Sequence, residues 1–323
     1  MTDASNAAPK YPAPSTVSEQ AKQWLAIQLP AGVYPPREDT AAWSALVEQT
    51  NSYLLSHYVA ASADLPVTLE DRTIGDVPVY VATPTAPHEQ SRQQSGVVYF
   101  DVHGGALLFG GGQVCRAGTA MSAASIGVQV WGVDYRIPPL HPYPAGLNDT
   151  VAAYRALLEV HHPSRIVVAG SSAGGNLAAA LMLRAKNEGL PLPAALILNT
   201  PEIDLTESGD TFQTLKEVDN VLSSLKEVNE MYADGADLTD PYLSPIFGDL
   251  SGFPPTFLQS GTRDLFLSNT VRMHRKLLAA GVEAELHVFE AMPHGGFGAA
   301  SPESQELIAA QRAFIAKHLD ALS

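Results

Sequence analysis

An α/β fold with a mostly parallel sheet is predicted by three features of the sequence. Short apolar runs alternate with helical stretches from residue 97 to the C-terminus, which is the pattern of consecutive β-α units. The runs are apolar without a break, as in strands that helices cover on both faces. The chain has 323 residues, of which 46% are hydrophobic, so it can bury the core of one large domain. In such sheets, functional residues gather at the carboxyl ends of the strands.

The N-terminal region is expected to be helical and to lie outside the sheet. Residues 1–15 are polar and rich in proline, so we expect a flexible tail. Residues 16–62 have apolar positions at helical spacing, which predict helices near Ser18–Leu29 and Asp39–His57. We expect these helices to contribute to a cap over the sheet.

The sheet is expected to belong to a domain that spans residues 63–323. Val67–Thr73 and Val77–Thr83 look like two strands joined in a hairpin at Gly75, and Pro84–Ser95 is a polar loop. Six further strands are expected at Val97–Val102, Val128–Tyr135, Arg165–Ala169, Ala194–Leu198, Thr256–Gln259 and Glu285–Phe289. Helices are expected at Gly146–His161, Ser172–Asn187, Leu265–Ala280 and Pro302–Leu322.

One long insertion interrupts the alternation of strands and helices. Asp204–Tyr242 separates two expected strands, and its middle part, near Gln213–Met231, has the pattern of a helix. We expect a cap insertion of about residues 205–240. Together with the N-terminal helices, it would form a helical cap over the strand ends.

Charge and composition limit the partners of the protein. With 19 basic and 34 acidic residues, the formal net charge is −15. Such a surface repels nucleic-acid phosphates and anionic lipids, so we expect neither nucleic acid nor a membrane as a partner. Cys115 is the single cysteine, which fits a reducing compartment. The N-terminus has no apolar signal region and no run of about 18 apolar residues occurs, so a cytoplasmic protein is expected.

The first chemical motif is the G-x-S-x-G sequence Gly170-Ser171-Ser172-Ala173-Gly174. It directly follows an expected strand and opens a helix rich in Ala and Leu, as a nucleophile elbow requires. The glycines allow the strand and the helix to approach closely, and the helix N-terminus directs N–H groups at the reacting oxygen. Ser172 is therefore the expected nucleophile. A phosphate-binding turn has similar geometry, but the segment lacks the G-x-G-x-x-G spacing and the GK[ST] ending.

A second glycine-rich turn, His103-Gly104-Gly105, follows another expected strand. The N–H groups of Gly104 and Gly105 can turn toward a bound carbonyl because no Cβ blocks that conformation. With the N–H group of Ala173, they would form an oxyanion hole. A plain glycine turn is the alternative, and we prefer that interpretation for the glycines at 110–112. His103 is expected to hold the loop by hydrogen bonding rather than to act as a base.

The general base is expected among four histidines that follow Ser172, because an acid and then a histidine come after the nucleophile in this arrangement. His274 and His318 lie in expected helices, and His287 lies inside the last expected strand. His294 lies in a loop just beyond a strand end, where its imidazole can reach the edge of the sheet. We therefore expect His294 to be the base.

The acid is expected to be Asp264, which lies just beyond the strand Thr256–Gln259. This position places it beside the last strand and His294. There it would fix the tautomer of the imidazole and stabilise the imidazolium ion. Asp204 and Asp240 are the alternatives, and we expect them to be loop and cap residues.

These motifs together resemble the hormone-sensitive-lipase-like family of esterases, also called bacterial family IV, over roughly residues 95–320. Six segments carry the resemblance in order: HGGALLFG (103–110), VDYRIPPLHPYPAGLND (133–149), GSSAGGN (170–176), DPYLSP (240–245), GTRD (261–264) and PHGGF (293–297). The resemblance implies an α/β-hydrolase fold with a helical cap, esterase activity, no cofactor and frequent dimers.

Four positions depart from the pattern of this family. Ala106 replaces the third glycine of the oxyanion motif, Ser171 replaces the usual Asp, and Leu140 replaces the usual Glu. Glu202 stands where the family usually has an apolar or aromatic residue. We expect the Glu202 side chain to face solvent.

The sequence thus predicts a serine carboxylesterase that hydrolyses short- to medium-chain acyl esters through an acyl-enzyme. A small-molecule ester is the expected substrate, and we expect no cofactor and no metal. The frequent dimers of the family favour a homodimer. A lactonase, or a deacetylase or amidase, that uses the same triad is an alternative. A non-catalytic ligand-binding relative and a nucleotide-binding protein are two further classes.

Overall fold

The computed structural model describes residues 11–29, 32–85 and 96–320, and its centre is one eight-stranded sheet. Most of the predicted tail and of the Pro84–Ser95 loop lies outside the described residues. The strands are β1 (Val67–Ile74), β2 (Val77–Pro84), β3 (Val98–Val102), β4 (Gln129–Val133), β5 (Ile166–Ser171), β6 (Ala195–Asn199), β7 (Thr256–Gly261) and β8 (Ala284–Phe289).

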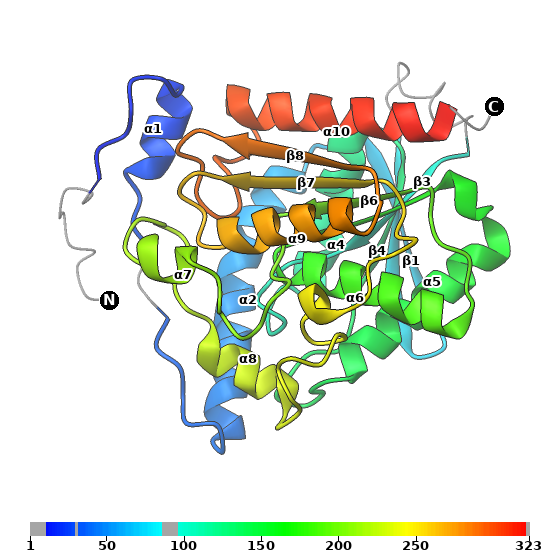
Figure 1. The fold of residues 1–323 in the computed structure, drawn as a ribbon, viewed down its shortest axis with the longest axis horizontal. Coiled ribbons are helices and arrows are strands. Elements are labelled where there is room, and N and C mark those ends of the chain that lie inside the picture. Colours follow the sequence, from blue (N-terminus) through cyan, green and yellow to red (C-terminus); the bar gives the residue numbers. More distant parts are fainter. Residues whose placement is uncertain (1–10, 30–31, 86–95, 321–323) are drawn as a thin grey trace.

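The sheet is parallel except at one edge (Figure 1). Its strand order is β1-β2-β4-β3-β5-β6-β7-β8. The hairpin of β1 and β2 is antiparallel, and β2 pairs antiparallel with β4. The other pairs, from β4 to β8, are all parallel. The predicted α/β class with a mostly parallel sheet is confirmed.

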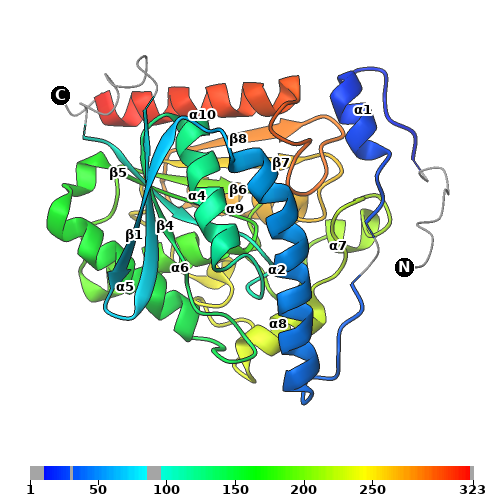
Figure 2. The same ribbon diagram turned by 180° about the vertical axis from the view of Figure 1, so that it is seen from behind.

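Helices cover both faces of this sheet. Helices α5, α6 and α9 lie on one face, and α4 and α10 lie on the other. The helices of the described residues are α1 (Glu19–Leu25), α2 (Thr40–Ser62), α4 (Gln113–Ile126), α5 (Ala145–Val160), α6 (Ala173–Glu188), α7 (Thr211–Thr214), α8 (Lys226–Ala233), α9 (Leu267–Ala279) and α10 (Pro302–Asp320). Short 3-10 turns lie at Pro163–Arg165 and Pro245–Phe247. Figures 1 and 2 show the two helical layers from opposite sides.

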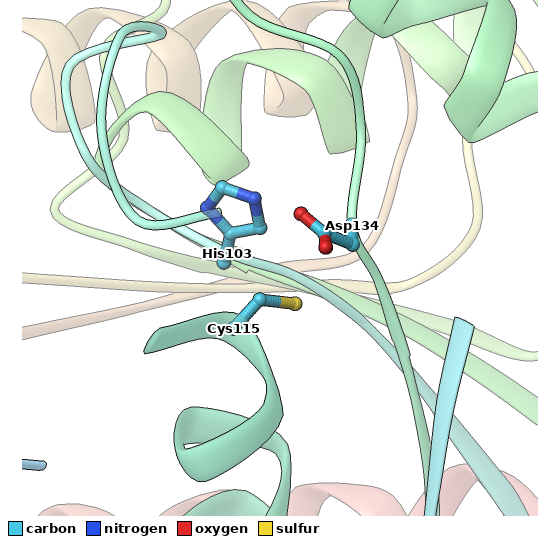
Figure 3. Close-up of side chains that lie close together, drawn as sticks. All are labelled: His103, Cys115 and Asp134. Carbon is cyan, nitrogen blue, oxygen red and sulfur yellow. The ribbon is translucent and has the colours of Figure 1, made fainter. Parts of the chain in front are cut away.

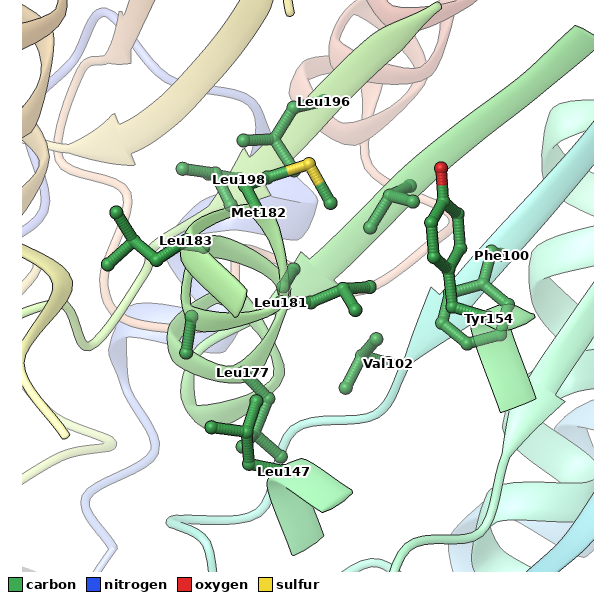
Figure 4. Packing of buried hydrophobic residues seen from close by; sticks show 14 of the residues in the cluster. Phe100, Val102, Leu147, Tyr154, Leu177, Leu181, Met182, Leu183, Leu196 and Leu198 are labelled. Carbon is green, nitrogen blue, oxygen red and sulfur yellow. The ribbon is translucent and has the colours of Figure 1, made fainter. Parts of the chain in front are cut away.

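Two apolar layers form because successive strand residues point to opposite faces. Phe100 and Leu198 pack toward α5, α6 and α9, whereas Tyr99 and Phe257 pack toward α4 and α10. Figure 4 shows the first layer, where Leu177 and other side chains of α6 lie against β3 and β6. Since helices cover both faces of the inner strands, these strands are nearly unbroken apolar runs, and this pattern makes them predictable from sequence.

Helix α4, which covers β4, was not expected from the sequence. Its side chains are mostly small, so the apolar periodicity that predicts a helix is weak. Small residues suit this position because a Cβ at Gly132 would lie 1.9 Å from Thr119 Oγ1, so helix and strand are in close contact. Gly127 ends the helix in the left-handed conformation, with φ of 83°.

The helix expected near Gln213–Met231 is wrong. The cap insertion instead contains two short helices, α7 and α8, separated by an irregular stretch. In this stretch, Asp219 Oδ1 accepts hydrogen bonds from the N–H groups of Val221 (2.9 Å) and Leu222 (3.1 Å). A side chain that accepts hydrogen bonds from nearby N–H groups stabilises a turn in place of a helix. The segment therefore does not form a helix, although its apolar residues have helical spacing.

Helices from the N-terminal region and from the insertion lie at the carboxyl edge of the sheet. One apolar cluster joins Trp43 from α2, Val228 from α8 and Leu108 from the loop after β3. Helix α1 packs on Met292 and Phe297, which flank His294. No helix among the described residues is long and apolar enough to cross a membrane.

Candidate active site

Ser172 lies at the sharp turn between β5 and α6. Its backbone has φ of 56° and ψ of −121°, an unfavourable conformation for a residue with a side chain, and such strain is typical of functional sites. The turn is possible only with glycine on either side. A Cβ at Gly170 would lie 2.1 Å from the Gly174 carbonyl oxygen, and a Cβ at Gly174 would lie 1.9 Å from the Val102 carbonyl oxygen. The turn presents the Ser172 hydroxyl at the carboxyl edge of the sheet.

Three side chains from three strand ends meet at this edge. His294 Nε2 lies 2.8 Å from Ser172 Oγ, and His294 Nδ1 lies 3.0 Å from Asp264 Oδ1. His294 follows β8 and Asp264 follows β7, so the parallel sheet brings their loops side by side. The structure thus joins the three residues that the sequence singled out, in one chain of two hydrogen bonds.

Asp264 is fully buried and is held by further hydrogen bonds. Its Oδ2 accepts a bond from Ser260 Oγ (2.6 Å), and its Oδ1 accepts one from the N–H group of Phe266 (2.9 Å). The Phe266 ring also packs edge-on against the His294 imidazole, with centroids 4.8 Å apart. These contacts fix the carboxylate and the ring that it orients, so little reorganisation is needed during a reaction.

His294 is buried among acidic groups. Burial lowers its pKa, but the charge and hydrogen bond of Asp264, with the charge of Asp219, outweigh this effect. The pKa of His294 is therefore raised above the usual value of 6.5. A histidine with a raised pKa accepts a proton more readily, as a general base must.

The glycine loop after β3 lies directly beside the nucleophile. A Cβ at Gly104 would lie 2.8 Å from the Ser171 carbonyl oxygen and 3.5 Å from Ser172 Cβ. Gly105 has φ of 125°, which favours glycine. In the described part of the chain, no hydrogen-bond acceptor is found for the N–H groups of Gly104 and Gly105. Ala173 is the first residue of α6, so its N–H group has no acceptor within the helix.

His103 holds this loop, as the sequence predicted. Its Nδ1 lies 2.8 Å from the Gly104 carbonyl oxygen, and its ring stacks on Tyr135 with centroids 4.0 Å apart. The Tyr135 hydroxyl donates a hydrogen bond to the His103 carbonyl oxygen (2.8 Å). Burial lowers the pKa of His103 and favours the neutral ring.

Comparison with known proteins identifies the family of this chain. A family model described as the α/β hydrolase fold matches residues 97–298, which is more than half of the chain. The chain belongs to this family. It is 31% identical over 246 residues to an esterase from Acinetobacter venetianus, and the match covers 74% of this chain and 81% of that one.

Solved structures of this α/β hydrolase family include close matches in fold. The crystal structure of the esterase E25 has a TM-score of 0.88 and 34% identity, with 96% of this chain and 97% of that chain covered. An esterase from the bacterial hormone-sensitive lipase family has a TM-score of 0.78 and 29% identity, with coverage of 93% and 96%. The resemblance to hormone-sensitive-lipase-like esterases is confirmed.

Glu202 does not face solvent, so that prediction is wrong for this α/β hydrolase. The residue is only 1% exposed, and its N–H group donates to the Ser172 carbonyl oxygen (3.1 Å). Burial raises the pKa of Glu202 to about 8, although a hydrogen bond with Asn229 opposes the shift. Within the described residues, Glu202 Oε2 has no hydrogen-bond partner. A carboxyl group that is neutral near pH 7 thus lies beside the nucleophile.

Asp219 is the site residue that sequence reasoning missed. Its Oδ2 accepts hydrogen bonds from the N–H groups of Leu265 (2.8 Å) and His294 (3.3 Å). A side chain of the cap insertion therefore holds both loops that carry the base and the acid. The available signal was local: an Asp-Asn pair inside an expected helix favours a turn. That signal predicts the turn but not the contact with residues 46 and 75 positions away.

The other departures and alternatives lie outside the hydrogen-bonded chain. Leu140 is 75% exposed, so its side chain lies outside the core. Ala106 adopts φ of 53° at the third glycine position. Asp204 forms an ion pair with Arg272, and Asp240 Oδ1 accepts a bond from the N–H group of Tyr242. Both aspartates are loop residues, as expected.

Proposed function

We propose that this protein is a serine carboxylesterase with Ser172 as nucleophile, His294 as general base and Asp264 as the orienting acid. The observation that carries the proposal is the pair of hydrogen bonds that links the three side chains. The predicted class of activity, hydrolysis of carboxylic esters, is confirmed by the similarity to esterases.

The first half of the reaction forms an acyl-enzyme. His294 Nε2 takes the proton of the Ser172 hydroxyl as the oxygen attacks the ester carbonyl, and Asp264 stabilises the resulting imidazolium. The N–H groups of Gly104, Gly105 and Ala173 receive the negative charge that develops on the carbonyl oxygen. His294 then gives its proton to the departing alcohol.

The second half releases the acid. His294 removes a proton from a water molecule, which attacks the acyl-enzyme through a second tetrahedral intermediate on the same N–H groups. His294 then returns the proton to Ser172. No cofactor or metal takes part in this scheme.

The biological setting is part of the same proposal. Small-molecule esters with short to medium acyl chains are the substrates, under a cap formed by residues 16–62 and the cap insertion. The apolar cluster of Trp43, Leu108 and Val228 supports this division of the chain. The single cysteine favours the cytoplasm. The esterase family favours a homodimer, which light scattering after size exclusion will test.

Removal of the Ser172 hydroxyl tests the proposal. Ser172→Ala is expected to lower kcat with a nitrophenyl ester by about 10⁴-fold or more while the unfolding transition stays in place. Ser171→Ala, in the same motif, is the control and should stay within about tenfold of the wild-type kcat. Nearly full activity of Ser172→Ala, or a larger loss in Ser171→Ala, contradicts the assignment.

The pH profile tests the role of His294. The base must be neutral, so kcat/KM should fall as the pH drops through the pKa of His294. Because that pKa is raised, half of the activity should already be lost above pH 6.5. A profile that stays flat down to pH 5 contradicts His294 as the base.

A further inference from the structure

Three side chains that the proposed mechanism does not use lie together behind the glycine loop (Figure 3). They are His103, Cys115 near the start of α4, and Asp134 just after β4. One ring nitrogen of His103, the Cys115 sulfur and the Asp134 carboxylate point toward one another (Figure 3). These three ligand atoms all lie within 4.8 Å of one another.

The histidine is already arranged as a metal ligand. Its Nδ1 bonds to the Gly104 carbonyl oxygen, so Nδ1 carries the hydrogen and Nε2 has the free lone pair. Nε2 is buried, and within the described residues it has no hydrogen-bond partner. Metal-bound histidines almost always donate their other N–H group to a carbonyl or carboxylate in this way.

The carboxylate is oriented as well. Asp134 accepts hydrogen bonds from the Tyr80 hydroxyl (3.0 Å) and from the N–H group of Gly112 (2.9 and 3.0 Å to its two oxygens). Such bonds fix a ligating carboxylate without using all of its lone pairs. Asp134 is only partly buried, so a cation can reach the cluster from solvent on this side.

The cysteine is the least engaged of the three. Its thiol donates a weak hydrogen bond to the Val133 carbonyl oxygen (3.7 Å) and lies beside the Thr119 hydroxyl. A tetrahedral zinc ion has bonds of about 2.0–2.3 Å and holds its ligand atoms about 3.3–3.6 Å apart. Side-chain rotations that shift the ligand atoms by about 1 Å would therefore bring them to that spacing, with water as the fourth ligand.

We propose that His103, Cys115 and Asp134 form a binding site for a zinc-type divalent cation. A set of nitrogen, sulfur and oxygen favours Zn²⁺ or Co²⁺ over Mg²⁺ and Ca²⁺, which prefer oxygen alone. Binding forms a metal–sulfur bond and releases the thiol proton to solvent. The net charge of −15 attracts cations to the protein.

The consequence for catalysis rests on the proposed function. His103 directly precedes Gly104 and Gly105, the proposed oxyanion donors. A cation bound to His103 is therefore expected to change the rate of ester hydrolysis, because each oxyanion donor contributes about 10²–10³ in rate.

A titration of the whole protein with Co²⁺ tests the binding itself. One Co²⁺ per chain should bind and produce the sulfur-to-cobalt charge-transfer absorption, and Zn²⁺ should abolish that band by displacement. Each Zn²⁺ that binds should release about one proton. Calorimetry repeated in buffers of different ionisation enthalpy measures this number. A spectrum without the charge-transfer band at one equivalent overturns the proposal.

Variants identify the ligands. Cys115→Ser should lose the band and bind at least about 100-fold more weakly, since even loss of an outer partner usually costs 10–100-fold. Asp134→Asn should keep the band and bind at least about tenfold more weakly. Unfolding transitions verify that both variants are folded. If either variant is unfolded, X-ray absorption of the zinc-bound wild type provides the test. A zinc ion with no sulfur ligand would overturn the proposal.

A second cluster supplies the matched control. Glu283, Glu285 and His318 also lie within 4.8 Å of one another, but the Lys317 ammonium occupies their carboxylates at 2.6 and 2.8 Å. His318→Gln should bind Co²⁺ as the wild type does, and loss of binding in this variant overturns the proposal. Ser172→Ala should also bind Co²⁺ unchanged, so a failed esterase assignment leaves the test of binding intact.

Discussion

Different interactions stabilise the central sheet and the cap insertion. The sheet buries continuous apolar strands between two helical layers. The cap insertion depends on polar side chains that bond to the backbone. Glu207 accepts from the Leu225 N–H group (2.6 Å), Asn229 donates to the Leu205 carbonyl oxygen (3.2 Å), and Asp219 accepts four N–H groups.

The difference shows where this enzyme tolerates change. Apolar packing is non-directional, so a loss in the sheet lowers stability without moving a particular group. A buried carboxylate that holds several N–H groups is directional, and its loss leaves those groups without partners. Two of the N–H groups that donate to Asp219 belong to the loops of Asp264 and His294. A change in the cap insertion can therefore displace residues of the site.

The largest effect is expected at Asp264, where the two regions meet. Asp264→Asn keeps the size of the side chain but no longer fixes the imidazole tautomer, so kcat should fall by about 10⁴-fold. Stopped assays with a nitrophenyl ester measure the loss. Asp249→Asn, an exposed position, is the control and should change kcat by less than about twofold. A loss below tenfold in Asp264→Asn would remove this residue from the mechanism.

A change in the sheet should separate stability from activity. Leu198→Ala removes a fully buried side chain of β6 and should lower the free energy of unfolding by about 2–5 kcal/mol. The kcat of the folded fraction should stay near the wild-type value. Urea unfolding and active-site titration measure the two quantities. Leu140→Ala, at an exposed position, should cost less than about 0.5 kcal/mol. A large fall in kcat of the folded Leu198→Ala protein would contradict the comparison.

Glu202 should make stability depend on pH. Its pKa rises from 4.5 to about 8 on folding, so the folded state holds the proton more tightly. The stabilisation is complete below about pH 4.5 and is lost as the pH rises through 8. Glu202→Gln cannot ionise, so the wild type should lose on the order of a few kcal/mol relative to this variant between pH 5 and pH 9. Parallel pH dependences of the two unfolding free energies would refute the buried neutral acid.

Asp219 gives the smallest effect and the sharpest test of the cap insertion. Asp219→Asn weakens the bonds to the Leu265 and His294 N–H groups, so kcat should fall by about tenfold, with a loss of about 1–2 kcal/mol in stability. Asp237→Asn is the matched control. Asp237 makes the same kind of turn, accepting from the Thr239 N–H group (2.9 Å), but it contacts neither loop. Equal effects of the two variants on kcat would show that the cap insertion is only a cover.

The sheet and the three residues proposed as the triad were predictable from the sequence alone. Each expected strand is present. The inner strands are apolar throughout because helices cover both of their faces, and the first two strands were recognisable as a hairpin. Ser172, His294 and Asp264 were recognisable because each directly follows a strand, and the carboxyl ends of parallel strands meet at one edge. These features are local in sequence, so a local pattern is sufficient to find them.

The folded structure was needed to find the burial of Glu202, the contacts of Asp219, and the cluster of His103, Cys115 and Asp134. Each depends on contacts between segments that are distant along the chain, such as the 75 positions between Asp219 and His294. Helix α4 was missed for a related reason. Its residues are small because the helix lies close to β4, and small residues do not produce the apolar periodicity that predicts a helix. Hydrophobic periodicity records which face of an element is buried, but not which element covers it. The partner of a buried polar group is therefore settled only when the chain is folded.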